Sequence, residues 1–240
     1  MSPWRQLCFY TKRFAKEAGE LMLCPFPILF EDNHLLVLNK PGGLLTQPSG
    51  TEQESLEMQA KVWLKEAYAK PGNVFLEPIH RLDKPVSGIV VFAKTSKALS
   101  RLHACIRDKK TKKVYFALIE VPPKARQGIL EDYLIHDDFR ANIVSSDHPQ
   151  GKLARLSYAW TGENTKGYLV RIELETGRYH QIRVQLAGIG CPIRGDVRYG
   201  ARHPFEQGLI ALHHAQFEIP HPITGKPCLF EAPLPPSFNN

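Results

Sequence analysis

The chain has 240 residues, 43% of them hydrophobic, and its formal net charge at pH 7 is +7. This length and composition predict a packed globular protein, and the positive charge favours an anionic partner such as RNA, DNA or an acidic membrane surface. The five cysteines show no CxxC spacing and no apolar run reaches membrane length, which argues against a disulfide framework, a zinc ribbon and a membrane span and favours a soluble, cytoplasmic protein.

The first residues of the chain differ in pattern from the rest. Residues 1–26 carry mixed charge without clear periodicity, and Lys16, Glu17 and Glu20 interrupt any apolar signal region. From there on, short apolar runs alternate with glycine and proline, and no fixed-period repeat indicates a solenoid. We therefore predict an N-terminal extension, 1–26, followed by one domain, 27–236.

Three segments carry helix signals. The segment 55–70 has a helical pattern and stops before a Pro-Gly pair. The segment 96–108 opens at Ser96, which we expect to be its N-cap, and the segment 180–190 ends at glycine. Helices and strands do not alternate strictly, which argues against a doubly wound fold.

Strand signals are more frequent than helix signals. Residues 89–93, IVVFA, form a continuous apolar run that is typical of a strand buried on both faces near the middle of a sheet. Residues 156–160, 168–175 and 209–219 alternate between the two faces with period two, as half-buried antiparallel strands do. The sequence therefore predicts an α+β fold with a mixed, mainly antiparallel central sheet flanked by helices and loops.

The stretch HRLDKPVSG, residues 80–88, leads into that buried strand. Pro85 keeps the residue before it out of helical geometry, and Gly88 can adopt backbone angles closed to other residues, so we expect a shaped loop on a rigid support. This loop carries Asp83. An isolated Asp commonly pairs with a neighbour, here Arg81, or caps a turn, and its spacing alone leaves that alternative open.

Three further stretches have the composition of site loops. NKPGG at 39–43 ends an apolar run with residues that permit close backbone approach to a ligand. KKVYFALIE places Tyr115 at the start of a strand, after the basic run 107–113. TGRYHQIRVQ at 176–185 brings polar and basic side chains into the first turns of a helix, where backbone N–H groups attract anions. The candidate site residues selected from the first and last stretches are Lys40, Pro41, Gly42, Arg178, His180, Gln181 and Arg183.

Together these stretches resemble the RluA-type family of pseudouridine synthases. HRLDKPVSG resembles that family's HRLDxxTSG loop. NKPGGL, the strand around Tyr115, TGRYHQIRVQ, PIRGDVRYG at 192–200 and LHHAQFEIPHPITGKP also match in order and approximate spacing. The resemblance covers residues 27–235, and several ordered motifs are far more specific than HRLD alone.

The resemblance implies a pseudouridine synthase fold and the isomerisation of uridine to pseudouridine within structured tRNA or rRNA. It implies Asp83 as the essential carboxylate, Tyr115 beside the flipped base, Arg183 paired with Asp83, and Arg81 in the gap left by the displaced nucleotide. Val86 departs from the pattern, because the family usually has Thr there. We also expect no N-terminal S4-type RNA-binding domain, so that target recognition falls mainly to the catalytic domain.

The reaction detaches uracil, turns the ring and rejoins it through carbon without net oxidation or hydrolysis, so we expect no cofactor and no metal. It needs an ionised carboxylate, and an Asp with an ordinary pKa of about 3.9 is charged at neutral pH. A nearby guanidinium offsets the effect of burial on that pKa. Tyr115 is the candidate for stacking on the flipped base and for accepting a proton, and an ordinary core tyrosine is the alternative.

The basic run 107–113 contains five basic side chains and one acid. We select Lys110, Lys112 and Lys113 from it as candidates for contact with RNA phosphates. A solvated turn after a helix is the alternative explanation of such a run.

Three rival functions are weighed against this interpretation. A metal hydrolase lacks its HExxH motif, and adjacent His213 and His214 in a predicted strand point to opposite faces. A glycosidase normally needs two cooperating carboxylates, and Glu77, the nearby second acid, has no motif around it. A catalytically silent RNA-binding or RNA-folding protein of the same fold is the third. The RNA, the uridine and the order of bond changes stay open, and a monomer is the default expectation.

Overall fold

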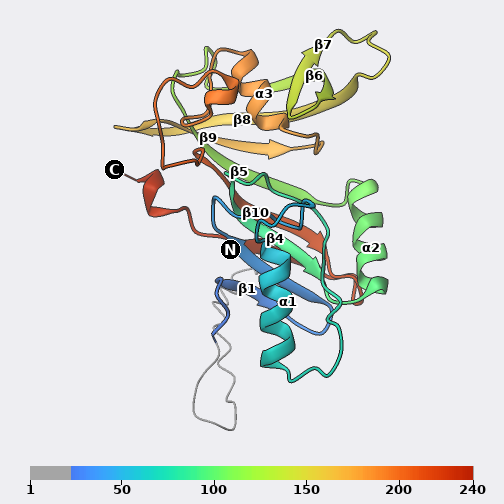
Figure 1. The fold of residues 1–240 in the computed structure, drawn as a ribbon. Coiled ribbons are helices and arrows are strands. Elements are labelled where there is room, and N and C mark those ends of the chain that lie inside the picture. The colour runs from blue at the N-terminus through green and yellow to red at the C-terminus, as the bar shows by residue number, and fades with distance from the viewer. Residues whose placement is uncertain (1–22, 240) are drawn as a thin grey trace, which may run out of the picture. The chain divides into compact units, whose positions relative to one another are not determined.

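The computed structural model describes residues 23–239, so the predicted N-terminal extension lies almost entirely outside the described residues. Eleven strands and three α-helices occur between these limits (Figure 1). No helix in this part of the chain is long and apolar enough to cross a membrane. The chain divides into two compact units, and the domain boundary predicted at residue 27 stays a prediction. Of the described residues, unit 1 comprises 23–84, 88–110 and 218–232, and unit 2 comprises 85–87, 111–217 and 233–239.

Unit 1 is built on short antiparallel strands. β1 (Ile28–Glu31) pairs with β2 (Leu35–Lys40), and β2 pairs with β4 (Ser87–Ala93). The two-residue strand β3 (Glu77–Pro78) also pairs with β4. Every residue of β4 after its first is buried, which confirms the prediction of a strand covered on both faces.

Two helices of unit 1 turn apolar side chains towards its core. α1 (Leu56–Ala67) buries four apolar side chains and is capped by Ser55. α2 (Ser96–Arg107) is capped by Thr95, whose Oγ1 accepts a hydrogen bond from the backbone N–H of Ala98 at 3.2 Å. The prediction that Ser96 is the N-cap is therefore wrong by one residue, because Thr95 is the residue with extended backbone angles and Ser96 is already helical.

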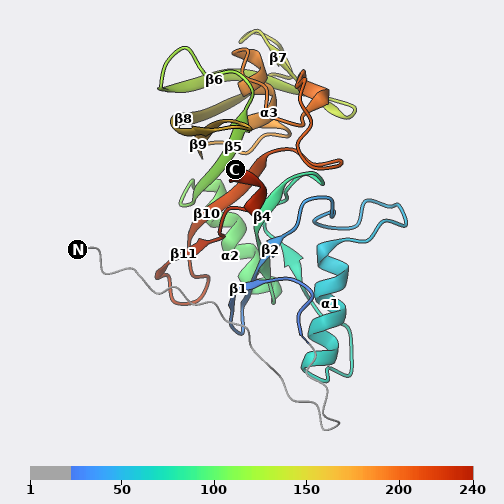
Figure 2. The same cartoon turned by 90° about the vertical axis from the view of Figure 1, so that its left-hand side faces the viewer.

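Unit 2 contains a longer antiparallel ladder (Figure 1 and Figure 2). β5 (Lys112–Ile119), β9 (Gly167–Leu174), β8 (Lys152–Asn164), β6 (Gln127–Asp137) and β7 (Arg140–Val144) are hydrogen-bonded neighbours in that order. The strands predicted in the segments 112–120, 156–160 and 168–175 are confirmed, and so is the α+β class with mainly antiparallel strands.

The remaining elements complete the two units. β10 (Leu212–Pro220) adjoins β5 and passes from unit 2 into unit 1, where β11 (Pro227–Glu231) pairs with it. In unit 2, α3 (Gln181–Gly188) packs near β6, β7 and the short 3-10 helix η1 (Val197–Tyr199). A second 3-10 helix, η2 (Pro236–Phe238), lies near the end of the chain.

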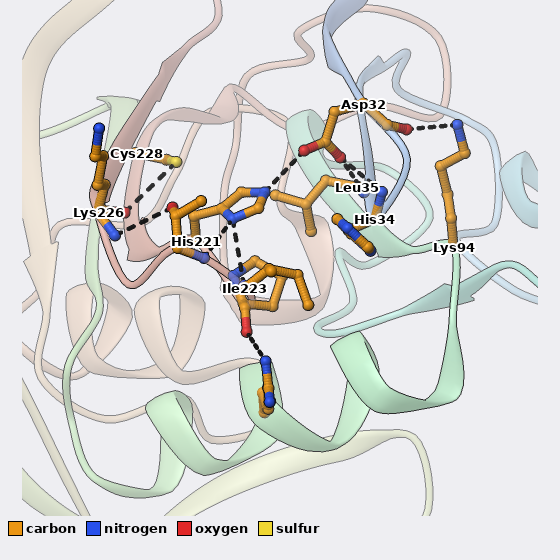
Figure 3. A network of polar contacts seen from close by, with 11 residues as sticks. Asp32, His34, Leu35, Lys94, His221, Ile223, Lys226 and Cys228 are labelled. Carbon is orange, nitrogen blue, oxygen red and sulfur yellow. Dashed lines mark hydrogen bonds and ion pairs between the residues drawn. The ribbon is translucent and has the colours of Figure 1, made fainter.

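The turn that follows β10 is anchored to the β1–β2 turn of unit 1 (Figure 3). His221 Nε2 donates to Asp32 Oδ2 at 2.8 Å, and its Nδ1 accepts from the backbone N–H groups of Ile223 and Thr224 at 3.3 and 3.2 Å. Burial raises the pKa of Asp32, but the hydrogen bonds that its carboxylate accepts outweigh burial and lower the pKa below its usual value. The PHPITGKP part of the last matched motif therefore stabilises unit 1.

Candidate active site

Asp83 lies in the loop between β3 and β4, and both of its neighbours in sequence are held by the segment that follows β2. Thr46 Oγ1 donates to the carbonyl of Leu82 at 2.9 Å and accepts from the N–H of Leu82 at 3.1 Å. The N–H of Gly43 donates to the carbonyl of Lys84 at 2.7 Å. The backbone on either side of Asp83 is therefore held in place by hydrogen bonds from another segment. Thr46 was not singled out from the sequence, since no local pattern marks its partner.

Lys40 is a buried link between the same two segments. Its Nζ donates to the carbonyls of Pro41 at 2.9 Å, Leu44 at 2.8 Å and Lys84 at 3.3 Å, and the residue is 0% exposed. Burial lowers the pKa of Lys40 to about 7, and the negative charge of Asp83 raises it in part. The substrate contact predicted for Lys40 is not supported by this placement, because its ammonium group faces three internal carbonyls and no solvent.

The other sites selected in unit 1 lie nearer the surface. Pro41 and Arg81 are exposed and Gly42 is half-buried, so their contact with substrate stays a prediction. Val86, which belongs to unit 2, is 2% exposed, so the side chain that replaces the family's threonine is packed in the interior.

Arg183 is buried in unit 2 and held by two neighbours. Its Nε donates to Asp196 Oδ2 at 2.7 Å and its Nη2 to Asp196 Oδ1 at 2.8 Å, while Nη1 donates to His180 Nε2 at 2.8 Å. Burial lowers the pKa of His180 to about 3, and the positive charge of Arg183 adds to this effect. His180 is therefore a neutral, internal side chain, and this placement does not support its predicted contact with substrate.

The start of α3 differs from the prediction. The helix begins at Gln181, so Arg178 precedes it, and His180 is the N-cap in the left-handed conformation with φ 52°. The Gln181 side chain is 3% exposed and its Oε1 accepts from the N–H of Arg178 at 3.0 Å. The prediction that Arg178 and His180 lie within the first turns is wrong, because His180 adopts left-handed backbone angles and helical geometry begins only at the next residue. The buried Gln181 side chain stabilises the turn, whereas the Arg178 side chain is exposed to solvent.

Tyr115 lies in β5 opposite Ile172 and is 6% exposed. Its ring stacks on that of His214, with a centroid separation of 4.3 Å and an interplanar angle of 12°. His214 is itself fully buried, and so is His213, whose Nδ1 lies 2.8 Å from Ser87 Oγ. Within residues 23–239 no group of three or more His, Cys, Asp or Glu side chains could hold a metal ion. The place of Tyr115 beside a flipped base stays a prediction.

The three lysines selected from the basic run differ in their surroundings. Lys110 and Lys112 are exposed, and each forms an ion pair of 3.1 Å with an acidic neighbour. Lys113 instead lies over the ring of Phe217, 5.7 Å from its centroid, and burial lowers the pKa of this lysine. Lys110 and Lys112 are therefore more accessible to an RNA phosphate than Lys113.

Comparison with known proteins identifies the family. Residues 34–188 match the family model described as RNA pseudouridylate synthase. The chain is 34% identical over 226 residues to the uncharacterized RNA pseudouridine synthase YhcT of Bacillus subtilis. This match covers 93% of this chain and 72% of the relative. It is also 34% identical over 227 residues to ribosomal large subunit pseudouridine synthase D of Zymomonas mobilis, and that match covers 88% of this chain and 70% of the relative.

A solved structure supports the fold. Human RNA Pseudouridylate Synthase Domain Containing 4 superposes with a TM-score of 0.72 at 23% identity, over 87% of this chain and 88% of that one. These findings define the class of the protein, an isomerase that modifies RNA. More particularly, the chain belongs to the RluA-type family of RNA pseudouridine synthases.

Proposed function

We propose that this enzyme converts specific uridines of tRNA or rRNA to pseudouridine with Asp83 as the essential carboxylate. The observation that carries the proposal is the double attachment of the Asp83 loop: Thr46 and Gly43 hold the residues before and after it. A carboxylate on a backbone restrained in this way can be kept close to a reacting atom, which lowers the entropic cost of the reaction.

We assign the remaining chemistry by the matched motifs. The bond between N1 of uracil and C1′ of ribose breaks, C5 bonds to C1′ instead, the hydrogen on C5 leaves as a proton, and N1 regains a proton. Asp83 acts as nucleophile or base, and Arg183 is the guanidinium proposed to pair with it. Tyr115 stacks on the flipped base, and its side chain, as the phenolate, is the candidate acceptor for the C5 proton, which returns it to the phenol.

The substrate is an RNA whose target uridine can leave its stack. Relatives named as ribosomal large subunit pseudouridine synthases favour rRNA as the first substrate to test, with tRNA as the alternative. Exposed Arg178, Lys110 and Lys112 are proposed to contact its phosphates. The monomeric state and the cytoplasmic location expected from the sequence stay predictions, and so does the domain 27–236.

The test is Asp83→Asn, compared with Asp138→Asn on an exposed turn of unit 2. Carbodiimide-dependent reverse-transcription stops are mapped in total RNA from cells that carry no copy, the wild-type copy or either variant copy of the gene. We expect a stop that requires the gene, is lost in Asp83→Asn and is kept in Asp138→Asn, while RNA affinity changes by less than about twofold in both. Modification that persists in Asp83→Asn contradicts the role of this carboxylate, and a wild type that modifies no RNA supports the silent RNA-binding protein.

A further inference from the structure

We propose that Asp196, His180 and Tyr199 form a positioning cluster that fixes the orientation of the Arg183 guanidinium for catalysis. The inference rests on the proposed function, because it deepens the role given there to Arg183. All four residues belong to unit 2: Arg183 on α3, His180 at the N-cap of α3, Asp196 directly before η1, and Tyr199 within η1.

The contact with Asp196 is the strongest element of the cluster. Two parallel hydrogen bonds, of 2.7 and 2.8 Å, join the Nε and Nη2 edge of Arg183 to both carboxylate oxygens. The two side chains are 6% and 1% exposed. A bidentate pair of this kind is strongly directional, and in a buried setting the removal of one partner leaves the other charge uncompensated.

His180 restrains the third nitrogen of the guanidinium, and the proton on the imidazole can be placed by elimination. Arg183 Nη1 can only donate, so His180 Nε2 must accept their 2.8 Å hydrogen bond. The single proton of the neutral imidazole is therefore on Nδ1, which lies 2.9 Å from the hydroxyl of Tyr199. Burial and the charge of Arg183 keep the ring neutral at physiological pH by lowering its pKa to about 3.

Tyr199 connects this pair to the backbone of β7. Its hydroxyl accepts from the N–H of Ala141 at 2.8 Å and donates to the carbonyl of Ala141 at 3.3 Å. The tyrosine ring also lies under the guanidinium of Arg183, with 5.1 Å between Cζ and the ring centroid. Through Tyr199 and His180, the backbone of β7 therefore fixes the position of the Arg183 guanidinium.

These contacts have a geometric consequence for Arg183. They use three of the five N–H bonds of a planar group, so the directions of the other two, on Nη1 and Nη2, are set as well. An arginine that can rotate still carries its charge but no longer holds those two bonds in fixed directions. Loss of a cluster member is therefore expected to lower kcat with little change in the KM for RNA.

The experiment is a double-mutant cycle on kcat with the full chain. Asp196→Asn and the milder Tyr199→Phe are each made in the wild type and in Arg183→Met, and Tyr68→Phe, on the exposed end of α1 in unit 1, is the control. In the wild-type background we expect a loss of about 30-fold or more for Asp196→Asn and of about fivefold for Tyr199→Phe. In the Arg183→Met background each change should cost less than about twofold, because the residues act through the arginine.

A second readout needs no RNA and separates this inference from the proposed function. In protein labelled with 15N at arginine and histidine, NMR should show a protected Arg183 Nε–H and a His180 ring protonated at Nδ1 at pH 7. Asp196→Asn should lose the protected Nε–H, and Tyr68→Phe should keep both signals. Tyr199→Phe keeps the inference testable if Asp196→Asn does not fold.

Two results overturn the inference. One is an equal loss of kcat in both arginine backgrounds, which indicates a general structural role. The other is an Arg183 Nε–H signal that Asp196→Asn leaves unchanged. If the wild type forms no pseudouridine in any RNA, the proposed function fails and the inference about catalysis fails with it. In that case unaltered NMR signals still identify the cluster as a structural one.

Discussion

Replacing Lys40 by methionine is expected to change how the stability of the protein depends on pH. Lys40 is 0% exposed, and burial lowers its pKa to about 7 from the ordinary value of 10.5. Between those two pH values the folded protein has lost the Lys40 proton while the unfolded chain still holds it. Unfolding therefore takes up a proton, and the free energy of unfolding rises by up to about 1.4 kcal/mol per pH unit. Below pH 7 both states hold the proton and this contribution is constant.

The expected size of the effect follows from the same two values. Integrated between pH 7 and pH 9, the rise amounts to about 2.3 kcal/mol, and Lys40→Met, which has no titrating group there, lacks it. The assay is urea denaturation followed by circular dichroism at several pH values over this range. The difference in free energy of unfolding, wild type minus variant, should increase with pH by about that amount.

A matched control is Lys65→Met, at an exposed position in the last turn of α1. Its difference from the wild type should stay constant with pH within about 0.5 kcal/mol. A Lys40→Met difference that is also constant with pH refutes the reasoning, since it means that Lys40 keeps the same pKa in the folded and unfolded states.

Three further outcomes are expected. Thr46→Val removes both hydrogen bonds to Leu82 at nearly constant volume, and should lower the free energy of unfolding by about 1–3 kcal/mol and kcat by a larger factor than an exposed Thr→Val change; unchanged values contradict the restraint of the loop. The double change Lys110→Gln and Lys112→Gln, at exposed positions between the end of α2 and the start of β5, should reduce the slope of log affinity for RNA against log salt by about 1.4 in a filter-binding titration, and an unaltered slope removes these residues from the interface. Gly167→Ala should lower the melting temperature, because φ is +143° and an added Cβ would stand 2.5 Å from a backbone oxygen of β5; a variant as stable as the wild type would show that the β8–β9 turn can relax.

Much of the local structure could be predicted because its signals lie within a few residues of each other. The alternation in 168–175 and the unbroken apolar run 89–93 correspond to β9 and β4, since a pleated strand turns every second side chain to the same face. The N-cap of α2 was displaced by one residue for an equally local reason. Thr95 and Ser96 can both cap a helix, and only the backbone angles decide which of them does so.

The candidate site was predicted less completely. Its motifs marked Asp83, Tyr115 and Arg183, and the order of those motifs indicated the family. The sequence does not show that Lys40 is buried, because a lysine followed by Pro-Gly-Gly has the pattern of an exposed loop. Neither does it show that Asp196 is the partner of Arg183, although the PIRGDVRYG stretch contained that residue.

The sequence by itself determined part of the secondary structure, the α+β class and the family, because periodicity and motif order are properties of neighbouring or ordered residues. Only the tertiary structure decided which polar side chains are internal supports. His180 and Lys40 are charged or polar types that water solvates well, and each has hydrogen-bonding partners in the interior. Some of these partners are near in sequence, and one for each residue comes from another segment, the Lys84 carbonyl for Lys40 and the Tyr199 hydroxyl for His180. The contacts between these segments depend on how η1 packs on α3 and how the loop after β2 packs on the Asp83 loop, and no short stretch of sequence specifies that packing.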